Sequence, residues 1–177
     1  MTKTISEVES ALITAEKNLN ERLIELNDES FTRPTNGGWS ALEIAEHVTL
    51  TNHYLLKVIR KHTDRALSRA ANMEDIPDEE SNLGKLERVG IQGSFEWPHP
   101  SHMTPTGKQP ICEIRAVLQE QFNECLAILH RLKNGEGYLA KITLNVYNFG
   151  KIDLYQWLCF VAQYAERHCR QLDWLND

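Results

Sequence analysis

Apolar residues recur every three to four positions in four stretches of the chain, a pattern typical of helices that bury one face. The first stretch follows Ser6-Glu7-Val8-Glu9, which has the form of a capping box. The second follows Ser40, where Glu43 completes another capping box, and is expected to run to about Thr63. Their apolar positions are Val8, Leu12, Ala15, Leu19, Leu23 and Leu26, then Ile44, Val48, Leu55 and Ile59.

Two further helices are predicted in the second half of the chain. Pro110 suits the first turn of one helix, and its apolar stripe ends before Asn134-Gly135. Asp153 can cap the other, with Gln156 three residues later. The stripe of this last helix consists of Trp157, Val161, Tyr164, His168, Leu172 and Leu175. Tyr164 and His168 are therefore expected to face inward.

The segments between the helices carry weaker patterns. Residues 65–109 are rich in glycine and proline and show no helical period, so we expect a long crossover connection between parallel-leaning halves of the molecule. Residues 141–149 alternate in polarity, but a single strand has no evident partner, so we interpret them as a loop. The chain is thus predicted to be all-α, an antiparallel four-helix bundle in one domain over residues 1–177.

Charge and composition exclude some classes of partner. The formal net charge is −6 and the basic residues are scattered, which argues against nucleic acid. The longest apolar run, Trp157–Ala162, is too short to cross a membrane, and the first residues carry no apolar targeting segment, so we expect a cytoplasmic protein without a membrane partner. The four cysteines lack C-x-x-C spacing and are predicted to be buried, reduced thiols: Cys112, Cys125, Cys159 and Cys169.

The candidate chemistry lies on the second and fourth helices. Inward side chains on facing helices can converge on a metal ion, and three protein ligands with an open position make a catalytic site. His47, at the border of its helix's buried stripe, and His168 are candidate ligands. Tyr164 precedes His168 by four residues, where a second imidazole would complete the set. A phenol with an ordinary pKa of about 10 must lose its proton to bind zinc or nickel well.

Several readings of these residues stay open. Glu43, four residues before His47, is either a third ligand or simply the capping carboxylate of its helix. His47 and His168 are either metal ligands or core-edge histidines hydrogen bonded to Tyr164 without an ion. Trp39 and Trp157 either line a pocket or anchor the core. The remaining histidines are expected to be solvated, two in the connection and three on helices: His99, His102, His53, His62 and His130.

The chain resembles the DinB-like superfamily in three places. These are Trp39-Ser40-x-x-Glu43-Ile44-x-x-His47-Val48, the stretch Pro105-Thr106-Gly107-Lys108, and Phe149-Gly150-x-x-Asp153-Leu154 running on to Arg167-His168-x-x-Gln171. The resemblance implies a four-helix bundle in an up-up-down-down arrangement, with a long connection between helices 2 and 3. It also implies a divalent metal held by three histidines, of which His47 and His168 match and Tyr164 does not.

The activities that the resemblance implies are thiol-cofactor S-transfer, isomerisation and metal-dependent hydrolysis. We therefore expect a metal-dependent enzyme, a hydrolase or a thiol S-transferase, that uses zinc or nickel and a low-molecular-weight thiol. Its small-molecule substrate would lie between His47, Tyr164 and His168. The alternative is a non-catalytic small-ligand-binding or scaffold bundle that has lost its metal. Related bundles often pair, so a homodimer is expected, although no stripe identifies its interface.

Overall fold

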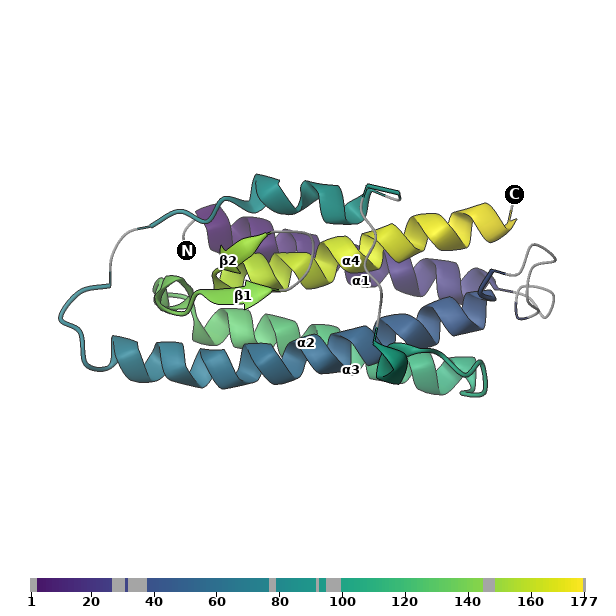
Figure 1. Ribbon diagram of the computed structural model, residues 1–177, viewed down its shortest axis with the longest axis horizontal. Helices are drawn as coiled ribbons and strands as arrows, with labels where there is room; N and C mark the ends of the chain where they lie inside the picture. The colour runs from purple at the N-terminus through teal and green to yellow at the C-terminus, as the bar shows by residue number, and fades with distance from the viewer. Residues whose placement is uncertain are drawn as a thin grey trace.

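The computed structural model describes residues 3–26, 31, 38–76, 79–91, 93–94, 100–144 and 149–176. These residues form four long α-helices that lie side by side (Figure 1). Their bounds are α1 (Lys3–Glu25), α2 (Ala41–Ala70), α3 (Ile111–Arg131) and α4 (Leu154–Asn176). The shorter elements are three 3₁₀ helices, η2 (Leu83–Gly90), η3 (Ser101–Met103) and η4 (Glu136–Leu139), and two strands, β1 (Ile142–Leu144) and β2 (Gly150–Ile152). The predicted all-helical class is confirmed in its main feature.

The directions of the four helices differ from the order that the resemblance implied. Arg22 near the end of α1 pairs with Asp173 near the end of α4, so these two helices run the same way. Arg131 near the end of α3 pairs with Asp64 of α2, and these two also run together, opposite to α1 (Figure 1). The order is up-down-down-up, and the expected up-up-down-down arrangement is wrong. The chain between α2 and α3 travels back along the helices, which lets both of them point the same way.

Helix α4 lies at the centre of the core. Every residue from 154 to 162 is buried, because α1, α2 and η2 all pack against this helix. Leu86 and Val89 of η2 are buried there, and Trp157, Tyr155 and Phe160 of α4 are among the largest fully buried side chains. Burial of a large apolar side chain contributes about 1.5–3 kcal/mol, so the first half of α4 is a strong anchor for the fold.

Three local predictions are wrong. Helix α1 begins at Lys3, so Ser6-Glu7-Val8-Glu9 lies inside it and does not cap it. Helix α2 continues to Ala70, seven residues beyond the predicted end at Thr63. The connection after it contains η2, whose apolar residues cover α4 although residues 65–109 show no helical period.

The segment interpreted as a loop contains a strand. Residues Ile142–Leu144 pair antiparallel with Gly150–Ile152, with Ile142 opposite Ile152 and Leu144 opposite Gly150. The partner strand lies immediately before α4 and was not predicted. Val146, part of the same alternating pattern, lies outside the described residues.

The cysteines follow the prediction in three cases. Cys125, Cys159 and Cys169 are buried free thiols, and burial raises the pKa of each to about 12, so they stay protonated. Cys112 is exposed, contrary to the prediction, because it lies on the solvent side of the first turn of α3. None of the helices in the described ranges is long and apolar enough to cross a membrane.

Candidate functional site

The start of α2 is built as the sequence predicts. The Ser40 side chain accepts a hydrogen bond from the Glu43 N–H, at 3.2 Å, and the Glu43 carboxylate accepts one from the Ser40 N–H, at 2.9 Å. Gly107 packs over this carboxylate with φ of +67°, and an added Cβ would lie 3.1 Å from the Glu43 Cγ. Only glycine suits this position, since it combines a left-handed backbone with close contact. The capping role predicted for Glu43 is therefore confirmed.

His47 is held one turn further along α2. Its side chain is buried, and its Nδ1 lies 2.8 Å from the carbonyl oxygen of Met103 at the end of η3. Because a carbonyl oxygen can only accept, Nδ1 carries the proton and Nε2 presents a lone pair. That lone pair lies 2.7 Å from the Tyr164 hydroxyl of α4, which donates to it. The contact fixes both the tautomer and the orientation of the ring.

His168 approaches the same place from α4. It is buried, and its Nδ1 donates to the Gln171 Oε1 at 2.9 Å, which leaves Nε2 as an acceptor. Nε2 is buried and has no hydrogen-bond partner among the described residues. Burial, with a smaller effect of the neighbouring His47, lowers the pKa of His168 to about 3, although the hydrogen bond with Gln171 opposes the shift. The ring is therefore neutral at pH 7.

The three rings form one corner between α2 and α4, which we call the histidine corner: His47, Tyr164 and His168. The ring centres of His47 and His168 are 5.4 Å apart, and those of Tyr164 and His168 are 4.6 Å apart. Burial raises the pKa of Tyr164 to about 12, although a hydrogen bond with Thr51 and the charge of Arg167 oppose this. The prediction that Tyr164 and His168 face inward is confirmed, and Tyr164 keeps its proton near neutral pH.

A carboxylate that the sequence analysis missed supports this corner. Glu46 is buried, and its oxygens accept hydrogen bonds from the Thr106 N–H at 2.8 Å, the Gly107 N–H at 2.6 Å and the Thr106 hydroxyl at 2.9 Å. Glu46 thus ties the segment 103–107 to α2, and the Met103 carbonyl of that segment orients His47. The sequence contains both the pair Glu46-His47 and the stretch Pro105-Thr106-Gly107-Lys108, but no local pattern connects them.

The two tryptophans lie in different surroundings. Trp39 is half-buried, and its ring centre lies 4.7 Å from that of His47, so it covers the corner from the start of α2. Trp157 is buried in the core, two turns before Tyr164 on α4. Of the connection histidines, His102 is exposed near Tyr54, and His99 lies outside the described residues. Among the helix histidines, His53 and His130 are exposed as predicted, whereas His62 is half-buried.

The donor set suits a transition metal in part. Two imidazoles that share a tetrahedral ion, each Nε2 about 2 Å from it, have ring centres about 5 Å apart, and the observed separation is 5.4 Å. Each Nδ1–H also has the oxygen acceptor that commonly orients a metal-binding histidine. Within the described residues no three His, Cys, Asp or Glu side chains converge on one point. The phenol of Tyr164 fits as a hydrogen-bond donor rather than as a ligand.

Comparison with known proteins identifies the family. The sequence profile of the DinB superfamily matches residues 11–172, which is most of the chain. The chain therefore belongs to the DinB superfamily. Searches of curated proteins and of solved structures gave no significant match.

Proposed function

We propose that this DinB superfamily protein is a metal-dependent enzyme of the hydrolase or thiol S-transferase type, centred on the histidine corner. In this proposal the four long helices are the DinB-like bundle, and residues 71–110 are its long connection. The observation that carries the proposal is the orphaned Nε2 of His168, which is buried beside the ring of His47, with ring centres 5.4 Å apart and ring planes at 72° to each other. A buried lone pair without a partner costs about 1–3 kcal/mol, which a bound cation or donor would offset.

In this proposal each residue of the corner has a separate role. His47 and His168 would hold a divalent ion such as zinc or nickel through their Nε2 atoms. A bound ion lowers the pKa of a water or a small thiol at its open positions, which supplies a nucleophile near neutral pH. Tyr164 would keep its proton at the hydroxyl and donate a hydrogen bond to the bound small molecule. Trp39 would shield the His47 side of the corner from water. The thiol itself rests on the family resemblance.

A specific observation favours a second candidate function. The Tyr164 hydroxyl already donates to the His47 Nε2 at 2.7 Å, which is a hydrogen bond in place of a metal bond. In this alternative the corner is a metal-free site that binds a small ligand, and His168 Nε2 accepts a hydrogen bond from that ligand. The protein would then be a binding or scaffold member of its family.

Metal titration of protein purified without an affinity tag distinguishes the metal-dependent enzyme from the metal-free binding protein. After removal of bound metal by a chelator, zinc or nickel should bind at one site per chain, measured by isothermal titration calorimetry. His47→Ala and His168→Ala should each abolish this binding, and His130→Ala, an exposed histidine on α3, should leave it unchanged. Absence of a one-to-one site, or its survival in both alanine variants, would contradict the metal proposal and favour the second candidate.

Replacement of Tyr164, which stands where the resemblance implies a third histidine, tests how much a third imidazole would add to the metal site. Tyr164→His should supply a third imidazole and tighten zinc binding by about 100-fold. Residues that only hydrogen bond to a metal ligand change metal affinity by about 10–100-fold, and a direct ligand should contribute at least as much. Ester hydrolysis and thiol transfer to small electrophiles should then be assayed with and without zinc. Activity that requires zinc and is lost in His47→Ala would support the proposal of a metal-dependent enzyme. Activity that survives both the removal of zinc and the His47→Ala substitution would contradict it.

A further inference from the structure

A cavity lies on the opposite side of the helices from the histidine corner. It occupies about 420 Å³ between α1 and α3, whereas the corner lies between α2 and α4. Its floor is apolar and consists of Leu19 and Leu23 of α1 with Leu118 and Phe122 of α3. The side chains at its rim, such as Asn20 and Gln119, are exposed, so the cavity opens to solvent. Its volume falls in the range of small-molecule sites.

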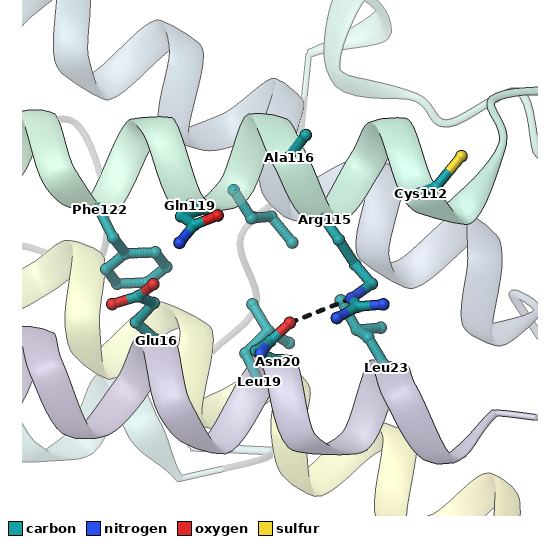
Figure 2. A pocket seen from close by; sticks show the side chains of 10 residues that line it. Glu16, Leu19, Asn20, Leu23, Cys112, Arg115, Ala116, Gln119 and Phe122 are labelled. Atoms are coloured by element: carbon teal, nitrogen blue, oxygen red, sulfur yellow. Dashed lines mark hydrogen bonds between the residues drawn. The ribbon is translucent and has the colours of Figure 1, made fainter.

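Opposite charges stand at the two ends of this cavity. Figure 2 shows Arg115 and Glu16 separated along the space between the helices, with Asn20 beside the arginine. The Arg115 Nε donates to the Asn20 Oδ1 at 3.1 Å, which orients the guanidinium across the cavity. Within the part of the chain that the structure describes, Arg115 has no acidic partner and Glu16 has no basic one.

This arrangement is unusual for half-buried charges on neighbouring helices. Arginine commonly meets a carboxylate through two parallel N–H bonds, and the single contact with Asn20 leaves both terminal nitrogens for another acceptor. Glu16 precedes Asn20 by one helical turn, and Figure 2 shows its carboxylate away from the Arg115 guanidinium, with no ion pair between the two. An unpaired cation and an unpaired anion therefore flank an apolar floor.

We propose that the α1–α3 cavity binds a small zwitterion with an apolar middle, such as an ω-amino acid or a short apolar peptide. The ligand's carboxylate would lie on Arg115, its ammonium on Glu16 and its carbon chain over Leu19 and Phe122. Charge complementarity at both ends selects a zwitterion over a simple fatty acid or amine. This proposal is independent of the histidine corner and of any metal bound there.

Titration of ¹⁵N-labelled protein with 6-aminohexanoate tests the proposal. The amide resonances of residues 16–23 and 112–122 should shift with a dissociation constant in the millimolar range, as expected for so small a ligand. Hexanoate and hexylamine, each with one of the two charges, should bind at least fivefold more weakly. Equal affinity for hexanoate, or shifts confined to other parts of the chain, would overturn the proposal.

Variants at the two charged ends complete the experiment. Arg115→Gln should weaken 6-aminohexanoate binding at least tenfold, and Glu16→Gln should remove the preference over hexanoate. Arg131→Gln changes another arginine of α3, one that pairs with Asp64 away from the cavity, and should have no effect. Circular dichroism confirms that each variant is folded. Unchanged binding in Arg115→Gln, or equal loss in Arg131→Gln, would overturn the assignment.

Discussion

The polar side chains of the histidine corner and of the α1–α3 cavity differ in their burial and in their hydrogen bonding. In the corner, polar side chains are buried and tied to specific partners: Glu46 accepts three hydrogen bonds, and His47 has a partner for each ring nitrogen. In the cavity, Glu16 and Arg115 are half-buried beside open space and carry no ion pair within the described residues. The side chains of the corner are thus held in one orientation by their hydrogen bonds, whereas the charged side chains of the cavity can still bind a ligand.

The difference has an energetic cause. A polar group removed from water must be hydrogen bonded, because an unsatisfied buried group costs about 1–3 kcal/mol. The segment 103–107 covers the corner and supplies those bonds, so His47 and Glu46 are deeply buried yet satisfied. Glu16 and Arg115 instead line an open cavity, where the Arg115 side chain makes one hydrogen bond, to Asn20, within the described residues (Figure 2). The orphaned His168 Nε2 is the exception in the corner, and our proposal places the bound ion or ligand there.

The same substitution at one glutamate in each region gives the largest expected contrast. Glu46→Ala should lower the free energy of unfolding by about 3 kcal/mol, because it leaves two backbone N–H groups and a hydroxyl without their charged acceptor. Glu16→Ala should change it by less than about 0.5 kcal/mol, since that side chain has no ionic partner in the described structure. Urea unfolding monitored by circular dichroism measures both. Equal losses in the two variants would remove the distinction between the regions.

Stability of the metal-free protein should also fall in acid because of His168. Its folded pKa of about 3 lies below the ordinary value of 6.5, so only the unfolded chain takes up this proton between those values. The contribution is fully present above about pH 6.5 and is lost as pH falls toward 3, with a slope of at most about 1.4 kcal/mol per pH unit.

Urea unfolding at pH 7 and pH 5, with a chelator present, measures this slope. His168→Gln should flatten it, and His53→Gln, at an exposed position of α2, should leave it as in the parent protein. Identical slopes for the parent and the His168→Gln variant would show that the folded and unfolded chains take up this proton equally, contrary to the buried environment of the ring.

Loss of a single hydrogen-bond donor in each region gives the smallest expected contrast. Tyr164→Phe removes the donor to His47 Nε2 and should destabilise the protein by about 1 kcal/mol. Arg115→Gln removes the donor to Asn20 and should cost less than about 0.5 kcal/mol, because water replaces the bond at this half-buried position. Thermal unfolding with matched controls measures both. A larger loss in Arg115→Gln than in Tyr164→Phe would contradict the assigned burial.

Features set by neighbouring residues were predictable from the sequence. The capping boxes at Ser40-Glu43 and Asp153-Gln156 both form, because their partners stand three residues apart. The inward position of Tyr164 and His168 follows from the helical period of α4. The continuous apolar run Trp157–Ala162 also indicated a helix that is buried on all its faces, although the sequence analysis used this run only to exclude a membrane span. It reflects burial of α4 on every side.

Features that depend on distant residues were not predictable in this way. His47 was placed at the edge of its stripe, yet it is fully covered, because Met103, 56 residues away, lies over it. Glu46 gave no local sign that it would accept bonds from Thr106 and Gly107. The strand Ile142–Leu144 was recognisable by its alternation, but its partner Gly150–Ile152 was not. Long-range contacts, which no periodicity encodes, decided the cases of His47 and Glu46.

The tautomers of His47 and His168 give the most direct measurement on the corner. A long-range ¹H–¹⁵N correlation spectrum of the metal-free protein at pH 7 reports which ring nitrogen carries the proton. We predict that both rings are protonated at Nδ1, and that one equivalent of zinc shifts the Nε2 resonances of both rings together. Protonation at Nε2 in either ring, or zinc that perturbs only one of them, would contradict a shared site.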